Sequence, residues 1–452
     1  MSKRVLILCT GNSCRSQMAE VIWNSISAKH QLDWQAVSAG SKPSGYVHPM
    51  SIVAMKEKDL PTEGLESKSS DPFINEDFDL VVTVCGNAKD ACPVWPGAKE
   101  LYHWPFEDPA DATGTDEEKQ VCFNEIRDQI WAKIQNYLLG RPQFDNAAQA
   151  DCLKLLAMAL SEDTGSPTLA GAVDCTTQSV IPTAATASAS FVSRAVGIVC
   201  GVEIAKLAIS TLAPDLELDC HVNDGDQVQP GDKIATFSGS AHQILTMERT
   251  CLNFMCRLSG ISTLAARFTE QVKGTEVKVL DTRKTTPGYR RLEKYAVACG
   301  GGANHRMGLY DAIMIKDNHL AFYKAWNKES KDAIVEGLQL ARDWVEANKS
   351  SLPNGDQTVV QLEVDTLEQF ERALPSKPDI VLLDNMTNEQ LATAVHRRNE
   401  AAPRVLLEAS GGVNLDTIAG IAKTGVDRIS IGALTHSAVN FDIGLDWTID
   451  SV

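Results

Sequence analysis

Nine side chains that carry or can carry positive charge fall within residues 279–320 of a chain whose formal net charge is −17. They are Arg283, Lys284, Arg290, Arg291, Lys294, His305, Arg306, Lys316 and His319. Guanidinium groups bind carboxylate and phosphate oxygens in pairs, so the window predicts a pocket for a small molecule with several negative charges. A nucleic acid would need an extended basic face, which the rest of this acidic sequence does not offer. The alternative is a solvated basic helix at 289–295.

Several of these cations stand at the ends of short apolar runs, which indicates a site at the rim of a sheet. Arg283 and Lys284 follow the run at 277–280, and Lys316 follows the run at 312–315. Comparable runs cover residues 359–365, 380–384, 405–408 and 428–431. Segments of helical periodicity separate these runs, and repeated strand–helix units of this length predict a parallel α/β barrel. The chemistry of such a barrel lies at the carboxyl ends of its strands.

Acidic and glycine residues occupy the other strand ends. They are Glu363, Asp365, Asp384 and Glu408, followed by Ser410, Gly411, Gly412 and Gly432. Carboxylates at these positions suit ribose hydroxyls or a Mg²⁺ on a pyrophosphate, and backbone amides of the Ser-Gly-Gly segment suit a phosphate. Each acid taken singly can equally be a solvated or ion-paired carboxylate. The set together predicts a site for an anionic substrate that carries a ribose.

A second candidate site opens the sequence, where Cys9 and Arg15 bracket five residues between a strand pattern and a helix pattern. The expected oxyanion loop consists of Thr10, Gly11, Asn12, Ser13, Cys14, Arg15 and Ser16. Its amides and the helix amino terminus can surround a tetrahedral oxyanion, with Arg15 on two oxygens. The same positive field is expected to lower the pKa of Cys9 and favour its nucleophilic thiolate. The alternative is a buried cysteine at a strand end.

The 452 residues have the composition of a globular protein and are enough for about three domains. Residues 1–140 carry 13 Lys plus Arg against 20 Asp plus Glu, and residues 141–452 carry 29 against 39, so both parts are acidic. A helical pattern stops at Gly140, and 141–150 reads as a linker. The twelve cysteines suggest reduced thiols, and no apolar run reaches membrane length, so we expect a cytoplasmic protein without membrane or nucleic-acid partners.

The sequence CTGNSCRSQMAE resembles the phosphate loop of the low-molecular-weight tyrosine phosphatase family, and more closely its thioredoxin-coupled arsenate reductase branch. Two further motifs support this resemblance over residues 1–140. VVTVCGNAKDACP contains Cys85 and Cys92, and HWPFEDPADATGT contains Asp108 before a proline. The resemblance implies a parallel-sheet domain in which Cys9 attacks arsenate and Asp108 acts as the general acid. Asn12, Ser16 and Glu20 match positions that support the loop.

The resemblance further implies a thiol relay. Cys85 attacks the adduct on Cys9 and releases arsenite, Cys92 then takes over the disulfide, and thioredoxin reduces it. A plain phosphatase would need only Cys9, Arg15 and Asp108. Ala110 stands where such a phosphatase usually carries an aromatic residue. A tyrosine phosphatase, or a redox- or oxyanion-sensing module that regulates the barrel, remains the alternative.

Residues from about 151 to the end resemble quinolinate phosphoribosyltransferase. The motifs are ERTCLN, DTRKTTPGYR, NHRMGLYDAIMIKDNH, LEVDTLEQ, LLDNM, EASGGVN and IGALTHSA, and they occur in the family's order. The resemblance implies an α/β sandwich domain at 151–256 with the tail 434–452, and an open α/β barrel at 257–433. A phosphoribosyltransferase acting on nicotinate or another ring acid is the nearest rival.

The resemblance also implies roles for named residues. Lys284, Glu363 and Asp384 are expected to be catalytic. The substrate-binding set adds Arg249, Thr282, Arg283, His305, Arg306, Lys316, Ser410, Gly411, Gly412, Ile431, Gly432 and Ala433. Mg²⁺ is expected to arrive with phosphoribosyl pyrophosphate rather than on fixed protein ligands. The family pattern implies a homodimer in which Arg249 reaches the neighbouring subunit's site.

Overall fold

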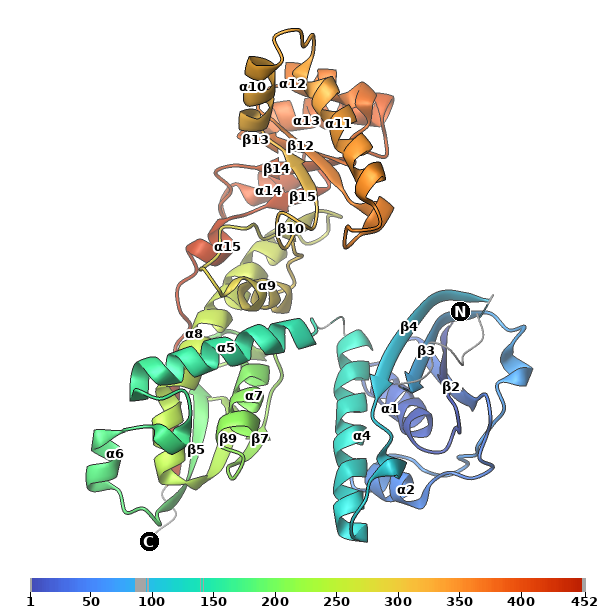
Figure 1. Ribbon diagram of the computed structural model, residues 1–452, viewed down its shortest axis with the longest axis vertical. Coiled ribbons are helices and arrows are strands. Elements are labelled where there is room, and N and C mark those ends of the chain that lie inside the picture. The colour runs from blue at the N-terminus through green and yellow to red at the C-terminus, as the bar shows by residue number, and fades with distance from the viewer. Residues whose placement is uncertain (1, 86–94, 96, 139, 141, 449–452) are drawn as a thin grey trace. The chain divides into compact units, whose positions relative to one another are not determined.

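The computed structural model describes residues 2–85, 95, 97–138, 140 and 142–448, and the chain divides into two compact units, Met1–Gln143 and Phe144–Val452 (Figure 1). The division falls within the stretch expected to be a linker. Among the described residues, no helix is both long enough and apolar enough to cross a membrane.

The amino-terminal unit is built on a four-stranded parallel sheet. Its strands are β1 (Lys3–Cys9), β2 (Trp34–Gly40), β3 (Phe78–Cys85) and β4 (Ala98–Phe106), in the order β2-β1-β3-β4. The helices are α1 (Arg15–Lys29), α2 (Pro49–Lys56) and α4 (Asp116–Leu138). Alternate residues of β1 enter separate cores, because successive strand side chains face opposite ways: Val5 and Ile7 pack in the cluster that contains residues of α1 and α4, and Leu6 and Leu8 in another.

The carboxy-terminal unit begins with helices and an antiparallel sheet. Its first helices are α5 (Asn146–Thr164), α6 (Cys175–Val180) and α7 (Val202–Leu212). The sheet has the order β16-β5-β9-β7, from strands Ile443–Thr448, Thr186–Ser193, Lys233–Ser240 and Glu217–Cys220. A two-stranded sheet pairs β6 (Gly197–Ile198) with β8 (Gln227–Val228). The long helix α8 (Ala241–Gln271) then runs continuously through the expected domain boundary at 256–257.

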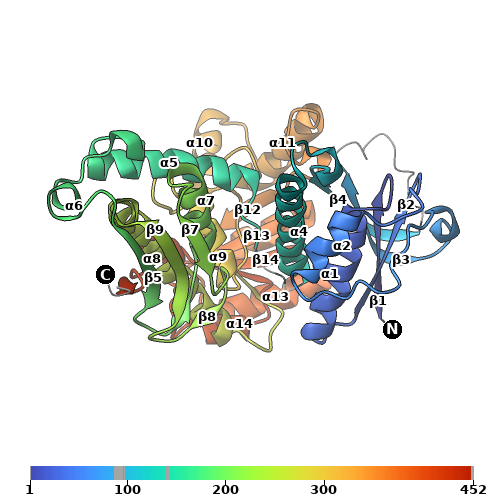
Figure 2. The ribbon, with the colours of Figure 1, turned by 90° about the horizontal axis from the view of Figure 1, so that it is seen from below.

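A six-stranded parallel sheet forms the rest of this unit (Figure 2). Its strands are β10 (Lys278–Leu280), β11 (Ile313–Ile315), β12 (Val360–Val364), β13 (Ile380–Asp384), β14 (Leu406–Ser410) and β15 (Arg428–Ser430). The helices are α9 (Arg290–Cys299), α10 (Asp317–Trp326), α11 (Ala333–Asn348), α12 (Leu367–Ala373), α13 (Asn388–Ala401), α14 (Ile418–Ala422) and α15 (Ala433–His436).

The strand order of this sheet, β10-β15-β14-β13-β12-β11, is that of a barrel opened between β10 and β11. Consecutive strands from β11 to β15 pair in parallel, and β15 then returns to pair with β10. All six carboxyl ends therefore lie at one edge. The predicted fold class, a phosphatase-like parallel sheet followed by an α/β sandwich and an open α/β barrel, is confirmed.

Candidate active sites

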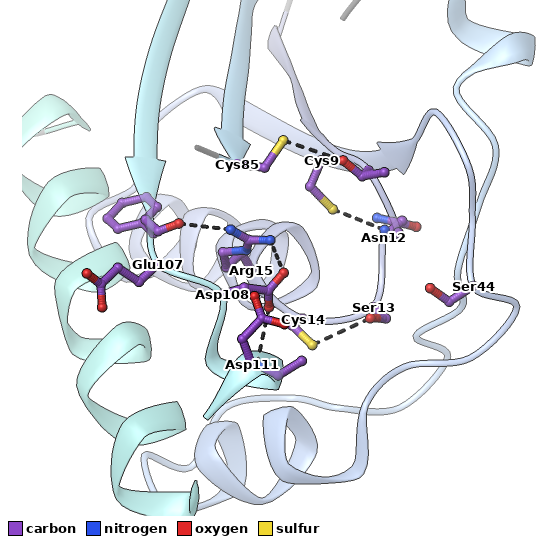
Figure 3. A pocket seen from close by; sticks show the side chains of 14 residues that line it. Cys9, Asn12, Ser13, Cys14, Arg15, Ser44, Cys85, Glu107, Asp108 and Asp111 are labelled. Atoms are coloured by element: carbon purple, nitrogen blue, oxygen red, sulfur yellow. Dashed lines mark hydrogen bonds and ion pairs between the residues drawn. The ribbon is translucent and has the colours of Figure 1, made fainter. Parts of the chain in front are cut away.

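The oxyanion loop lies between β1 and α1 and lines a cavity of about 420 Å³ (Figure 3). All the loop residues from Cys9 to Arg15 contribute to this lining, and Ser16 lies just behind it. Cys85, at the end of β3, and Asp108, which follows β4, reach the same cavity. The described candidates of the amino-terminal unit are therefore brought together. Cys92 lies outside the described residues.

The loop is held from outside by the segment 41–48. Backbone amides of Ser41, Lys42, Ser44 and His48 donate to the carbonyls of Cys9, Thr10, Gly11 and Ser13 at 2.9–3.2 Å. These bonds occupy the outer side of the loop. The amide of Asn12 instead donates to Cys9 Sγ at 3.0 Å, as an amide directed at a central anion would.

Asn12 keeps the loop in this shape from within the core. Its backbone has a left-handed φ of 46°, and its fully buried side chain donates to Ser16 Oγ at 3.0 Å and to Ser38 Oγ at 2.9 Å. Its Oδ1 accepts from Lys68 N at 2.7 Å. Glu20 in turn accepts from Ser38 N at 2.9 Å. Asn12 and Ser16 thus support the loop directly, and Glu20 acts one contact further out.

The electrostatics of Cys9 differ from the expectation. Burial is the largest cause and raises the pKa of this thiol, and the neighbouring Cys85 raises it further. The hydrogen bonds from Ser16 and Asn12 and the charge of Arg15 only partly offset these effects. One reason is that Arg15 is already engaged. Its Nη1 donates to Phe106 O at 2.8 Å and its Nη2 forms an ion pair with Asp108. The prediction of a lowered Cys9 pKa is therefore wrong for this structure.

Cys85 contacts the oxyanion loop at Thr10, whose hydroxyl donates to Cys85 Sγ at 3.8 Å. Figure 3 shows Cys85 and Cys9 on the same side of the cavity. Four lining residues that the sequence reasoning did not select are Ser44, Phe106, Glu107 and Asp111. Phe106, Glu107 and Asp111 are close to Asp108 in the sequence, and this closeness could have indicated them. Ser44 is distant from the loop in the sequence, so no such signal marks it.

A second cavity, of about 430 Å³, lies at the carboxyl ends of the parallel strands. Its lining includes nine residues of the predicted set: Thr282, Arg283, Lys284, His305, Arg306, Lys316, Glu363, Asp384 and Ser410. Met314, Leu382, Glu408 and Ser430 also line it. Residues from all six strand ends therefore face one space, as the barrel prediction requires.

Ion pairs already balance part of this charge. Lys316 forms an ion pair with Glu363, and Arg306 Nη1 donates to Ala312 O at 2.7 Å. Burial, together with the neighbouring charge of Arg283, lowers the pKa of Arg306. Two cations held close together in a half-buried site favour an anion between them, because an anion relieves their repulsion.

Six predicted residues lie outside the lining of this cavity. Ile431 is buried and donates its N–H to Leu280 O at 2.9 Å, and Ala433 begins α15. Gly411 and Gly412 have left-handed φ values of 94° and 62° just after β14. Gly432 packs against Lys284, where a Cβ would lie 2.9 Å from its Cδ. Arg249 is exposed on α8.

Lys294, part of the basic window, lies behind the cavity rather than in it. It is fully buried and pairs with the equally buried Asp281. Lys294 Nζ donates to His305 O at 2.9 Å, and Asp281 Oδ1 accepts from His305 N at 2.8 Å. The pair therefore fixes the backbone that presents His305 and Arg306. Neither a solvated helix nor a direct substrate contact describes this lysine.

Comparison with known proteins follows the same division of the chain. Family models described as quinolinate phosphoribosyl transferase, N-terminal and C-terminal domains, match residues 174–259 and 261–446. A model described as low molecular weight phosphotyrosine protein phosphatase matches residues 4–147.

Two relatives of the carboxy-terminal unit agree with the quinolinate phosphoribosyl transferase matches. The nicotinate-nucleotide pyrophosphorylase (carboxylating) of Mycobacterium leprae is 41% identical over 61% of this chain and 91% of its own. The solved nicotinate-nucleotide pyrophosphorylase of Francisella tularensis is 33% identical, with a TM-score of 0.57, over 68% of this chain and 100% of the other. A solved arsenate reductase in the phosphate-binding state is 30% identical over 30% of this chain and 98% of the other, with a TM-score of 0.27. The chain belongs to the quinolinate phosphoribosyltransferase family, and it carries in addition an amino-terminal unit of the low-molecular-weight phosphatase type.

Proposed function

We propose that the carboxy-terminal unit converts quinolinate and phosphoribosyl pyrophosphate into nicotinate mononucleotide, CO₂ and pyrophosphate, a step of NAD biosynthesis. The observation that carries this proposal is the cavity in which Arg283, Lys284, Arg306 and Lys316 face Glu363 and Asp384. The cations suit the carboxylates and phosphates of the two substrates, and the acids suit ribose hydroxyls. Family membership supports the same assignment.

The reaction needs charge stabilisation more than acid–base chemistry. The pyridine nitrogen attacks C1 of the ribose as pyrophosphate leaves, so positive charge develops on the sugar ring. In this proposal Glu363 and Asp384 stabilise that charge, and Lys284 stabilises the leaving pyrophosphate. The cationic ring nitrogen then accepts the electron pair left by the departing CO₂. Arg283, Arg306 and Lys316 hold the other carboxylate and orient the ring.

Mg²⁺ on the pyrophosphate belongs to this proposal. Among the described residues, no group of three or more His, Cys, Asp or Glu side chains is arranged to hold a metal ion. Mg²⁺ usually binds one or two protein carboxylates and fills its other positions with water and substrate phosphates. The carboxylates of Asp384 and Glu363 are ligands of this type. They therefore fit an ion that binds with the substrate, and when bound the ion would neutralise the leaving pyrophosphate.

The test is turnover by the purified full-length chain with quinolinate, phosphoribosyl pyrophosphate and Mg²⁺. We expect nicotinate mononucleotide and one CO₂ for each pyrophosphate. Lys316→Ala should lower kcat/KM by about 100-fold or more, because it removes a charged substrate contact and leaves Glu363 unpaired. Turnover of nicotinate without CO₂ release would instead favour the rival ring-acid transferase.

For the amino-terminal unit we propose reduction of arsenate to arsenite with thioredoxin as the final reductant. The specific support is that Cys85 lines the same cavity as Cys9 and lies 3.8 Å from the Thr10 hydroxyl. A phosphatase has no use for this second thiol.

The steps balance in atoms and electrons. The Cys9 thiolate displaces an arsenate oxygen, which leaves as water with a proton from Asp108. Cys85 then attacks the Cys9 sulfur, so the sulfur–arsenic bond breaks and arsenic gains its two electrons. Arsenite departs, and a disulfide between Cys9 and Cys85 remains. Cys92 then attacks Cys85 and frees Cys9, and thioredoxin supplies the two electrons that reduce the new bridge.

Two variants separate this proposal from a phosphatase. Cys85→Ser and Cys92→Ser should each abolish thioredoxin-dependent arsenate turnover, and both should retain any hydrolysis of an aryl phosphate that the wild type shows. Full arsenate turnover in Cys85→Ser would refute the relay.

The homodimer in which Arg249 completes the neighbouring site is also part of the proposal. Mixing inactive Arg249→Ala subunits with inactive Lys316→Ala subunits should restore activity if dimers exchange.

A further inference from the structure

Glu408 is a carboxylate that reaches the phosphoribosyl cavity from β14 although the residue is fully buried. An isolated buried carboxylate is costly, so its partners show how it is used. One oxygen is anchored across the sheet, where Glu408 is in register with Arg428 of β15 and Arg428 Nε donates to Oε2 at 3.0 Å. Burial raises the pKa of Glu408, but the contacts with His305 and Arg428 outweigh it and the pKa is lowered.

The other oxygen, Oε1, faces His305. It lies 3.1 Å from Nε2 of that imidazole, which is buried as well. The distance defines an electrostatic contact, because the two groups are not aligned as a hydrogen bond. Among the described residues neither atom has a hydrogen-bond partner. Unpartnered buried polar atoms are rare and call for an explanation, and both of these belong to residues that line a substrate cavity.

The second ring nitrogen of His305 fixes the position of the proton. Nδ1 accepts the backbone N–H of Arg306 at 2.7 Å, so Nδ1 carries a lone pair. A neutral ring with that pattern has its proton on Nε2, beside Glu408. The backbone of His305 is held by Asp281 and Lys294. The orientation of the ring about that fixed backbone is then set by the Arg306 N–H on Nδ1 and by Glu408 beside Nε2.

We propose, on the basis of the phosphoribosyl transfer proposed above, that Glu408 is a positioning residue that keeps His305 in its Nε2–H form and holds its imidazole in place at the wall of the cavity. The buried Nε2–H is stabilised by the carboxylate beside it. Glu408 itself need not touch the substrate. A purely structural alternative makes Glu408 only the counter-ion of Arg428.

A double-mutant cycle separates the two roles. Glu408→Gln keeps the shape, but its neutral amide has a single oxygen and cannot place an acceptor beside both Arg428 and the Nε2–H. We expect kcat/KM to fall by about 10- to 100-fold, because the buried Nε2–H loses its charged neighbour and the ring loses its fixed orientation. In a His305→Asn background the same change should cost less than about threefold, because its effect passes through the imidazole. Equal losses in both backgrounds, or an unchanged kcat/KM in Glu408→Gln, would overturn the proposal.

Asp224→Asn is the matched control. Asp224 is also a buried carboxylate, but it accepts from the amides of Gly201 and Val202 at the start of α7 and lies outside the cavity. This change should lower the melting temperature and leave kcat/KM of the folded enzyme within about twofold. The comparison separates a general effect of neutralising a buried carboxylate from an effect on His305.

A measurement on the wild-type chain keeps the proposal testable if a variant does not fold. Nitrogen-15 spectra of histidine-labelled protein distinguish the two neutral tautomers, and His305→Asn assigns the signal among the nine histidines. We expect the Nε2–H form for His305, and an Nδ1–H form would refute the assignment. This readout does not depend on turnover, so its failure is distinct from failure of the proposed reaction, which the wild-type assay would reveal by itself.

Discussion

At the scale of single residues, both sites show charges that are already paired before a substrate arrives. Arg15 is paired with Asp108, and Lys316 with Glu363. Type and spacing identified Arg15, Lys316 and Glu363, and the family resemblance identified Asp108. A pairing depends on side-chain direction, which neither spacing nor resemblance gives. The expected low pKa of Cys9 was wrong for the same reason, since burial outweighs an arginine that another carboxylate already engages.

The hydrogen bond from Ser16 gives a first prediction for Cys9. Ser16 Oγ lies 2.9 Å from Cys9 Sγ and lowers a thiol pKa that burial has raised. Ser16→Ala should therefore raise the pKa of Cys9 further. Because the thiolate is the reactive form, the pH profile of Cys9 alkylation should move to higher pH. At pH 7.5 the rate should fall by about 2- to 10-fold, the worth of one hydrogen bond, as measured by iodoacetamide labelling and mass spectrometry.

Ser13→Ala is the control for this prediction. Ser13 Oγ contacts Cys14 Sγ at 3.4 Å and lowers the pKa of that thiol instead. Its removal should slow labelling of Cys14 and leave the Cys9 profile in place. Equal slowing of Cys9 in both variants would mean that loop shape, and not the Ser16 hydrogen bond, sets its reactivity.

At the scale of elements, the strands of the carboxy-terminal sheet were predictable because their sequences are continuous apolar runs. Strands of a parallel sheet are buried on both faces, so an apolar run itself marks a strand, as in β13. The role of α9 was not predictable. Its charged residues Glu293 and Lys294 are fully buried, and their partners Arg257 and Asp281 lie outside the helix, 36 and 13 residues earlier in the sequence. Glu408 was visible as a strand end, but nothing in the sequence pairs it with His305.

The buried Lys294–Asp281 pair gives a second prediction. Burial raises the pKa of Asp281 and lowers that of Lys294, and their mutual attraction opposes both shifts. Lys294→Met leaves Asp281 buried without its cation, which typically costs about 3–5 kcal/mol of folding free energy. We expect the carboxy-terminal unit to unfold at a lower urea concentration. Alkylation of the fully buried Cys200, followed against urea, reports on that unit alone.

An exposed lysine provides the comparison. Lys273 pairs with Glu270 on the surface of α8, so Lys273→Met removes the same charge from a solvated position. Its urea midpoint should stay close to that of the wild type. If both lysine variants unfold at the same concentration, the buried pair does not stabilise the unit in the way proposed.

At the scale of the whole molecule, the hydrophobic cores follow the division into two units. One cluster of buried residues lies entirely within residues 152–443, and the other three lie within residues 5–134. Each candidate cavity is likewise lined by residues of one unit. A unit with its own core and its own site has what it needs to fold and act by itself.

This division gives the last prediction, that the chain separated between residues 143 and 144 yields two active proteins. Because neither core is cut, we expect the fragment 144–452 to form nicotinate mononucleotide with a kcat/KM within about twofold of the full-length chain. The fragment 1–143 should match the full-length chain in arsenate turnover with thioredoxin.

The same assays decide whether the amino-terminal unit is a sensor: arsenate or an oxidant added to the full-length chain should leave phosphoribosyl transfer unchanged. A large change that disappears in the fragment 144–452 would show that the first unit regulates the second, and the independence argued from the separate cores would then be wrong.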